Sequence, residues 1–255
     1  MRPDGHNAEA SRHKPFVTVV TVVFNGAQDI ASTIESVLTQ AFDDKEYIIV
    51  DGGSDDGTLA IVASYDGRID LVVSEPDRGI YDAMNKAIAR ASGEYILFMN
   101  CGDTFASIDA LSAAARAAQR GTEQLIFGSW LRRDAAGRHT RCLPSLNQGI
   151  FNHQAILYSR SIHAWHGDYV DVRGLSTADY LFFASLLASG SVASKTVDVS
   201  IATIDVSGTS AGLQTFSQKH AIDYLCGRVS RLTLILVLIL HPLYFHLKQL
   251  VRRWS

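Results

Sequence analysis

The sequence contains only three cysteines among its 255 residues. Cys101, Cys142 and Cys226 lie far apart and are odd in number, so their spacing predicts neither a disulfide framework nor a zinc site. We therefore expect a protein of a reducing compartment. The first fourteen residues, MRPDGHNAEASRHK, lack the apolar stretch of a signal peptide. We expect them to form a disordered arm, and we do not expect export.

Basic charge is not in excess either, because 23 Lys and Arg face 26 Asp and Glu, for a net charge of -3. A protein that binds nucleic acid needs a cationic surface to neutralise phosphates. The composition therefore argues against nucleic acid as the main partner. The hydrophobic fraction of 47% is ample for the core of one large domain or two small ones.

Apolar segments alternate with helical patterns in the first hundred residues. Each expected strand is short and rich in β-branched or aromatic residues, and the four cover residues 16–23, 46–51, 69–73 and 94–99. Between the first two, Ile30, Ile34, Val37 and Leu38 recur at helical spacing. After the second, Ser54 is expected to cap a helix whose first turn carries Asp55 and Asp56. Strands alternating with helices predict an α/β fold with a mainly parallel central sheet and flanking helices.

The second half of the chain has a less regular pattern. A helix is expected over 107–119 and another over 179–190, with strands at 124–131, 139–143, 153–159 and 195–204. We expect this mixed half to share one sheet with the first half.

Polar residues follow the expected strands at their carboxyl ends, where parallel sheets place their ligand crevice. Asn25 follows the first strand, Asp51 the second and Asp103 the fourth. Asp51 can accept a hydrogen bond from a base or a ribose, or simply cap a turn. Asp103, after Gly102, can hold a hard divalent cation or be an ordinary turn aspartate.

Charged residues also gather between the third strand and the helix that follows it. Glu75, Asp77 and Arg78 stand just before this helix. Arg78 is suited to a phosphate. Further along, Asp82 and Asn85 share a polar face with Lys86, as an ordinary solvated helix face also does. The opposite side of this helix is expected to be apolar and to carry Ile80, Met84, Ala87, Ile88 and Ala91.

Four ordered segments, VTVVTVVFN, IIVDGGSDDGT, SEPDRGIYDAMNKAI and GEYILFMNCGD, together resemble family-two glycosyltransferases of the GT-A fold. The likeness covers roughly residues 15–210 and is greatest to bacterial members that build exopolysaccharide and lipopolysaccharide. Two later segments, FNHQAILYSR and STADYLFFASLLASG, resemble the acceptor-side strand and the start of the catalytic helix in that family.

The resemblance implies a role for each matching position. Asp179 would be the catalytic base, Asp103 would hold Mn²⁺ or Mg²⁺, and His153 and Gln154 would shape the acceptor side. The donor nucleotide-sugar would be bound by Asn25, Asp51, Glu75, Asp77, Arg78, Asp82 and Asn85. One acidic residue stands at the metal position, where the family often has two. Ala178 precedes the base, where the family often has glutamate.

The function that these roles imply is inverting transfer of a sugar from a nucleoside-diphosphate donor, by family default a UDP-sugar, to an acceptor hydroxyl. The acceptor would be a saccharide or a lipid-linked intermediate of cell-surface polysaccharide. The alternative is a non-catalytic nucleotide-sugar-binding or scaffold protein of the same fold. A nucleotidyltransferase would need a glycine-rich basic loop after the first strand, and FNGAQDI has no such loop.

The last part of the chain carries the most apolar run, LTLILVLILHPLYFHL at 232–247. It is shorter than the roughly 20 residues of a spanning helix, and Pro242 interrupts it. Basic residues on both sides favour peripheral contact with an anionic membrane surface, whereas a helix docked on the domain is the alternative. We expect a disordered arm (1–14), a catalytic domain (15–212, divided at 103/104 into nucleotide-binding and acceptor halves) and a membrane-associating helical tail (213–255). The expected location is cytoplasmic, on the inner face of the cell membrane.

Overall fold

The computed structural model describes residues 14–205 and 213–239. The predicted arm therefore lies, except for Lys14, outside the described residues. The predicted boundary at 212/213 falls at the edge of an undescribed segment, and Pro242 in the tail lies outside the described residues.

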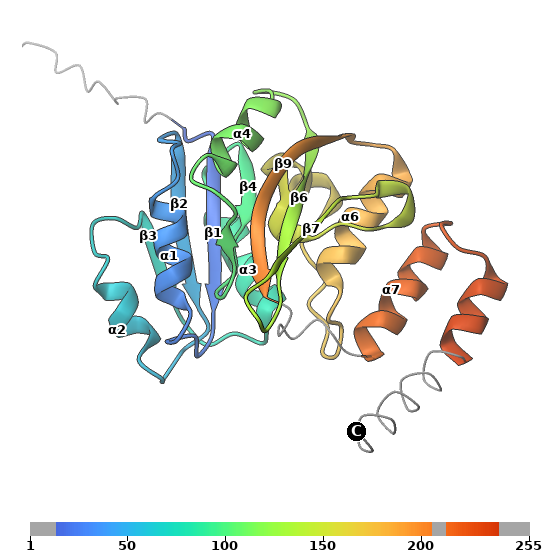
Figure 1. Cartoon of the computed structure of the whole chain (residues 1–255), viewed down its shortest axis with the longest axis horizontal. Helices are drawn as coiled ribbons and strands as arrows, with labels where there is room; N and C mark the ends of the chain where they lie inside the picture. The colour runs from blue at the N-terminus through green and yellow to red at the C-terminus, as the bar shows by residue number, and fades with distance from the viewer. Residues whose placement is uncertain (1–13, 206–212, 240–255) are drawn as a thin grey trace, which may run out of the picture.

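One nine-stranded sheet runs through the described chain (Figure 1), in the order β3-β2-β1-β4-β8-β6-β9-β5, with β7 paired to β6. Its first four strands are parallel: β1 (Val17–Val23) pairs with β2 (Lys45–Asp51) and β4 (Tyr95–Phe98), and β2 pairs with β3 (Leu71–Ser74). All seven residues of β1 are buried. This is the burial expected of a parallel strand that has helices on both faces.

The other strands make the sheet mixed. They are β5 (Thr104–Phe105), β6 (Gln124–Arg133), β7 (His139–Cys142), β8 (Ile156–Ser159) and β9 (Ala193–Asp205). β8 is antiparallel to both β4 and β6, whereas β6 and β9 are parallel. The predicted parallel arrangement thus holds for the first half, and the expectation that both halves share one sheet is confirmed.

Two helical layers cover the sheet. α1 (Ile30–Leu38) and α4 (Ala110–Ala117) contribute to one apolar cluster, and α3 (Ile80–Arg90) and α6 (Ala178–Ser189) contribute to the other. Short helical turns complete the fold: η1 (Leu146–Gln148), η2 (His153–Ala155), η3 (Arg160–Ile162) and α5 (His163–His166). Both clusters contain residues from before and after position 103, so the two predicted halves are packed into one body.

The predicted start of the helix after β2 is wrong. α2 (Thr58–Ala63) begins after Gly57, whose φ of 98° ends the preceding loop, and its first turn carries no acidic residue. The Ser54 hydroxyl instead accepts a hydrogen bond from the backbone N–H of Asn25. Asp56 lies before the helix, and its carboxylate accepts from the N–H of Thr58. Ser54 and Asp56 thus connect this loop to the loop after β1, and Asp56 also binds the first residue of α2.

Two smaller expectations also differ from the structure. The strand expected at 153–159 begins as the η2 turn, and only Ile156–Ser159 pairs in the sheet. Ile80, expected on the apolar side of its helix, is exposed at the start of α3. Both differences lie where a helical element begins beside the cavity described below, and there the side chains face the cavity instead of the apolar core.

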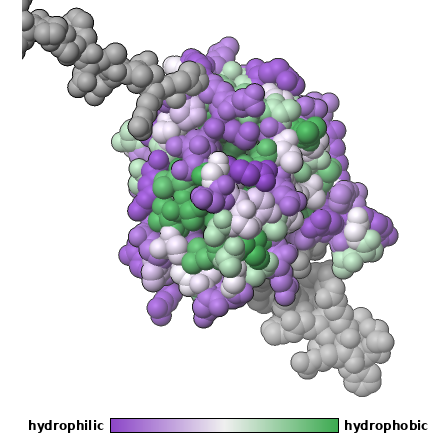
Figure 2. Space-filling model, turned by 90° about the vertical axis from the view of Figure 1, so that its left-hand side faces the viewer, coloured by the Kyte–Doolittle hydropathy of each residue, from purple (hydrophilic) through white to green (hydrophobic). Residues whose placement is uncertain are grey.

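The β3 edge of the sheet is short, and its side chains alternate between half-buried and exposed. Figure 2 shows the side of the molecule that lies to the left in Figure 1, where β3 and α2 are found; its surface is mainly hydrophilic, with separate apolar areas. A short edge strand in such a surface is a poor template for pairing with another chain.

The C-terminal part contains two described helices. α7 (Leu213–Leu225) packs on α6, where Ile222 joins Tyr180 and Ala184 in a small buried cluster. A second helix covers 231–239, and most of its large apolar side chains are exposed. Among helices within the described ranges, none combines the length and apolarity that a membrane crossing requires.

Candidate active site

A cavity of about 720 Å³ opens between the turn after β4, the turn at η2, the start of α6 and one side of α7, with the ends of β6 and β9 beside them. Among the residues lining it are Asn100, Asp103, His153, Gln154, Thr177, Asp179, Asp205, Thr215 and Lys219. Asp103 and Asp179, the predicted metal ligand and the predicted base, therefore line the same cavity. Volumes of this order are ordinary for small-ligand sites.

Asp103 is placed by a tight turn at the end of β4. Gly102 has a φ of 95°, which favours glycine, and the N–H of Asp103 donates to the carbonyl of Asn100 at 2.9 Å. The hydroxyl of Thr33 in α1 donates to the Asp103 carbonyl at 2.8 Å. With its backbone held on both sides, the Asp103 carboxylate is directed into the cavity, where its Oδ2 accepts from Nε2 of Gln154 at 2.6 Å.

Burial raises the pKa of Asp103 to about 6, although His153 and the Gln154 amide partly oppose this rise. Ionising the Asp103 carboxyl in the fold therefore costs more free energy than ionising it in water. A cation bound beside it would remove that cost, because an opposite charge favours the ionised form.

Asp179 lies in the first turn of α6. Its Oδ1 accepts from the hydroxyl of Tyr81 at 2.7 Å, and its Oδ2 lies 2.7 Å from Nδ1 of His153. Burial alone would raise the pKa of Asp179, but His153 and Tyr81 hold it below its usual range. The group is thus kept as an anion although it is enclosed.

His153 and Gln154 connect the two carboxylates. The side chain of Asn152 accepts from the N–H of Gln154 at 3.0 Å and so fixes the η2 turn. From this turn, His153 contacts Asp179 while Gln154 contacts Asp103. The other ring nitrogen of His153, Nε2, lies 3.0 Å from Nδ2 of Asn100. The pair therefore holds both ends of the site from one short turn.

Asp51 and Asn25 form a separate group at the ends of β2 and β1. Asp51 is fully buried, and its Oδ2 accepts from the N–H groups of Gly53 and Ser54 and from the Ser74 hydroxyl. Its Oδ1 is buried with no hydrogen-bond partner among the described residues. Asn25 has a φ of 50°, and its side chain accepts from the N–H of Asp55. Neither residue lines the 720 Å³ cavity.

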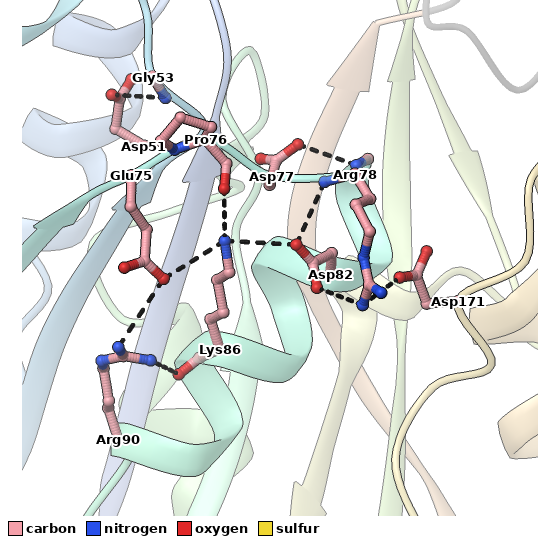
Figure 3. Close-up of polar contacts among 11 residues, drawn as sticks. Asp51, Gly53, Glu75, Pro76, Asp77, Arg78, Asp82, Lys86, Arg90 and Asp171 are labelled. Carbon is pink, nitrogen blue, oxygen red and sulfur yellow. Dashed lines mark hydrogen bonds and ion pairs between the residues drawn. The ribbon is translucent and has the colours of Figure 1, made fainter.

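The charged residues around the start of α3 make a surface network, which Figure 3 shows. Arg78 pairs with Asp82 at 2.9 Å and with Asp171 at 2.8 Å, and its side chain is 77% exposed. Lys86 lies between Glu75 and Asp82, at 3.3 Å from each. The guanidinium end of these pairs is open to solvent, whereas Asp82, Asp171 and Lys86 are largely covered. An ion pair with a solvent-exposed partner contributes little stability, so Arg78 can leave its partners at low cost.

Two other predicted donor residues also make local contacts. Asp77 accepts from the N–H of Gly79 at 2.9 Å, and burial raises the pKa of its carboxyl. The Asn85 amide donates to the Tyr169 carbonyl and accepts from the Tyr169 N–H. Asn85 thereby fastens α3 to the segment before α6.

The structure thus brings together Asp103, Asp179, His153 and Gln154, all of which line the cavity. The seven predicted donor residues lie outside its lining, and their roles stay predictions. Reasoning from the sequence missed Tyr81, Asn100 and Lys219, because no local pattern marks a tyrosine, asparagine or lysine that a distant segment will approach.

The residues in the cavity can offer a divalent cation one protein ligand, Asp103. In the part of the chain that the structure describes, no three His, Cys, Asp or Glu side chains are grouped as a metal site would need. Asp103 can still supply one carboxylate oxygen to a hard cation that keeps phosphate and water as its other ligands. Its enclosed position and raised pKa suit that arrangement.

Comparison with known sequences gives relatives of two kinds. The chain is 27% identical over 249 residues to a PGL/p-HBAD biosynthesis glycosyltransferase of Mycobacterium bovis, covering 94% of this chain and 91% of that one. It is 38% identical over 104 residues to an uncharacterized glycosyltransferase of Mycobacterium tuberculosis, covering 40% of each chain.

Comparison with solved structures confirms the predicted GT-A fold. Staphylococcus aureus TarS in complex with UDP-GlcNAc superimposes with a TM-score of 0.67 at 17% identity, covering 87% of this chain and 66% of that one. The mannosyltransferase PcManGT of Pyrobaculum calidifontis, in complex with GDP-Man and Mn²⁺, gives 0.64 at 18% identity, covering 86% and 66%.

The resemblance seen in the sequence is also confirmed at the level of the family. Residues 18–165, more than half of the chain, match the family described as Glycosyl transferase family 2. The matched region contains the turn that carries Asp103 and the turn that carries His153 and Gln154. The chain belongs to glycosyl transferase family 2.

Proposed function

We propose that this protein is an inverting glycosyltransferase that moves a sugar from a nucleoside-diphosphate donor to an acceptor hydroxyl. The observation that carries the proposal is the shared cavity of Asp103 and Asp179, whose carboxylates are held by adjacent residues of one turn. Asp103 can hold a cation, and Asp179 can accept a proton. When an alcohol displaces a diphosphate, the alcohol must lose its proton and the diphosphate must have its negative charge stabilised.

In the proposed reaction, Asp179 accepts the proton of the acceptor hydroxyl while the hydroxyl oxygen forms its bond to the anomeric carbon. The bond from that carbon to the diphosphate oxygen breaks, and its electron pair leaves with the diphosphate. Attack from the face opposite the leaving group inverts the anomeric configuration. Tyr81 and His153 keep Asp179 ionised and oriented before the proton arrives.

The leaving diphosphate develops negative charge, which a site must stabilise. A divalent cation, Mg²⁺ or Mn²⁺, would supply this stabilisation when it is bound. Asp103 would hold it, and Gln154 would keep the Asp103 carboxylate facing the cavity. The presence of Mn²⁺ in the PcManGT complex supports this assignment.

The donor nucleoside is proposed to bind at Asp51. Its buried Oδ1 lacks a partner among the described side chains and backbone groups, and a buried acceptor without a partner is costly. A uracil N–H would satisfy it. UDP-sugars are therefore the proposed donors, in keeping with the UDP-GlcNAc that the TarS complex contains. Arg78, Asp82 and Glu75 would line the nucleotide side after their surface ion pairs rearrange.

The acceptor is proposed to be a saccharide or lipid-linked intermediate of a cell-surface polysaccharide, met at the inner face of the cell membrane. The PGL/p-HBAD biosynthesis glycosyltransferase among the relatives supports a cell-surface product. The exposed apolar side chains of the helix at 231–239, which begins with the exposed Arg231, suit peripheral contact with an anionic lipid surface.

The test is donor turnover. Purified protein is incubated with a panel of nucleotide sugars, Mn²⁺ and candidate lipid acceptors, and the released nucleoside diphosphate is measured. We expect Asp179→Asn to lower the rate by about 10²–10⁴-fold and to leave UDP binding intact. Asp66→Asn, at an exposed turn, is the matched control. An equal absence of turnover in wild type and Asp179→Asn, with UDP-sugar still bound, would favour a non-catalytic binding protein.

A further inference from the structure

The segment before α6 is fixed from outside by α7. Gly174 has a φ of 86°, and residues 174–177 lead from it directly into the first turn of α6. Gln214 and Gln218 of α7 each donate from Nε2 to the Gly174 carbonyl at 2.6 Å. A helix whose contacting residues lie 40 and 44 positions later in the chain thus anchors the start of this segment.

Gln218 makes the larger set of contacts. Its Oε1 accepts from the N–H of Ser176 at 3.0 Å, from the Ser176 hydroxyl at 3.1 Å and from the Thr177 hydroxyl at 3.1 Å. Thr177 occupies the N-cap position of α6 and is only 4% exposed, yet its side chain makes no capping bond. Its hydroxyl is committed to Gln218. The helix start is therefore held by α7 in place of its own cap.

The residue that follows Asp179 is held by the same helix. The Tyr180 hydroxyl donates to Asp223, a carboxylate that is 4% exposed and also pairs with Lys219 at 2.7 Å and Arg228 at 3.5 Å. Thr177 and Tyr180, which stand on either side of Asp179 in the chain, are thus both bound by α7. The side of α7 that makes these contacts also contributes Thr215 and Lys219 to the cavity.

We propose that Gln218 is a positioning residue for Asp179, so that α7 is part of the catalytic unit and the expected division between domain and tail at 212/213 does not separate function. The proposal rests on the proposed role of Asp179 as the base. Gln218 does not line the cavity and would act only through Ser176 and Thr177. Proton transfer depends steeply on the placement of the base, and misplacement by about 1 Å can cost about 10²-fold in rate.

Three substitutions separate positioning from simple support of the fold. Gln218→Leu keeps the size of the side chain and removes every polar contact. Gln218→Glu keeps an oxygen that accepts from Ser176 and Thr177 and gives up the donor to Gly174. Gln214→Leu, one turn earlier, removes the other bond to the Gly174 carbonyl and leaves Gln218 bonded to Ser176 and Thr177, so it is the matched control.

We expect Gln218→Leu to lower kcat about 10–100-fold with KM for the nucleotide sugar unchanged. Gln218→Glu should restore activity to within about 3-fold of wild type. Gln214→Leu should behave as wild type. If kcat of Gln218→Leu stays within about 2-fold of wild type, or if Gln218→Glu is as damaging as Gln218→Leu, the proposal is overturned.

Two further measurements keep the proposal independent of expression and of the proposed reaction. Thr177→Val removes one donor to Gln218 and should lower kcat in the same direction if Gln218→Leu does not fold. Hydrogen exchange of the amides over 176–181 should be faster in Gln218→Leu than in Gln214→Leu. Equal exchange in the two variants would contradict the positioning role of Gln218. Faster exchange in Gln218→Leu, with no turnover by the wild-type protein, would contradict only the proposed function.

Discussion

Nδ1 of His153 lies 2.7 Å from Oδ2 of Asp179, and His153 therefore contacts the group proposed to take the acceptor proton. The next residue, Gln154, holds Asp103 on the cation side. One backbone turn thus fixes the distance between the two ends of the proposed chemistry. The sequence suggested only that His153 lines the acceptor side, whereas its contact with Asp179 makes it a candidate for tuning the base.

Removing a hydrogen bond to Asp179 should move the acid limb of the rate profile. His153 and the Tyr81 hydroxyl lower the pKa of Asp179 against the effect of burial. Tyr81→Phe removes one of these groups, so the pKa should rise and kcat should begin to fall at a higher pH. The measurement is kcat from about pH 2.5 to pH 9, because the acid limb of wild type lies below the ordinary aspartate pKa of about 3.9. His153→Phe should give a larger shift in the same direction.

The control for this series is Tyr65→Phe, which removes an exposed hydroxyl bonded to Glu35. Its profile should coincide with that of wild type. Tyr169 packs near Tyr81 and Asp179, so its phenol must also be considered as a group facing the base. An unchanged acid limb in both Tyr81→Phe and His153→Phe would contradict the assignment of Asp179 as the base.

Asp103→Asn should stabilise the protein without ligand, most clearly at neutral pH. The pKa of Asp103 is about 6 in the fold and about 3.9 in an unfolded chain. Its contribution to stability is thus fully present below about pH 4 and is lost as the pH rises through about 6. Since the cavity beside the carboxylate is open to solvent, which screens the charge, we expect a gain of about 1–2 kcal/mol at pH 7.5.

Thermal unfolding of wild type and Asp103→Asn at pH 4 and pH 7.5 tests this point. The variant should melt a few degrees higher at pH 7.5 and close to wild type at pH 4. Mn²⁺ with UDP should raise the Tm of wild type more than that of the variant, because the variant lacks the anionic anchor. A variant that loses stability at pH 7.5 would show that the ionised Asp103 already has a stabilising partner.

Asp51→Asn should weaken UDP binding by about 10–100-fold, the loss expected for a hydrogen bond to a charged acceptor (about 1.5–3 kcal/mol). Titration calorimetry with UDP measures it. Ser74→Ala is the control, because it removes only a contact to Oδ2 and leaves the unpartnered Oδ1 in place. Unchanged UDP affinity in Asp51→Asn would contradict the proposed position of the nucleoside at the end of β2.

Leu236→Glu should weaken binding to vesicles of phosphatidylcholine and phosphatidylglycerol. Leu236 is 47% exposed in the helix at 231–239, and transferring such a side chain from water is worth about 1.5–3 kcal/mol when it is fully buried. Leu143→Glu replaces a leucine that is 62% exposed on another part of the surface and should bind as wild type. Equal sedimentation of all three proteins with vesicles would refute membrane contact by this helix.

Local patterns predicted the elements of the first half well because their cause is local. The seven residues of β1 are β-branched and buried on both faces, and such a run has few other stable conformations. The same reasoning misplaced the start of α2, because Ser54 and the two aspartates after it have the composition of a helix cap. Their hydrogen bonds go instead to the loop after β1, a contact that no local pattern contains.

The candidate site was predictable where a residue ends a strand. Asp103 and Asp51 could be placed at the carboxyl edge of the sheet from their position in the chain alone. The sequence did not indicate that Asp103 would share a cavity with Asp179 while Asp51 stayed outside its lining. Nor did it indicate that Arg78 would lie in a surface network with Asp82 and Asp171.

By itself, the sequence determined that this chain forms alternating strands and helices with acidic residues at the strand ends, because hydrophobic period and turn residues act over a few positions. Only the tertiary structure decided that His153 would contact Asp179 and that Gln218 would contact Thr177 at the start of its helix. Those contacts join residues 26 and more positions apart. Their energies depend on how whole elements pack, and packing is a property of the complete fold.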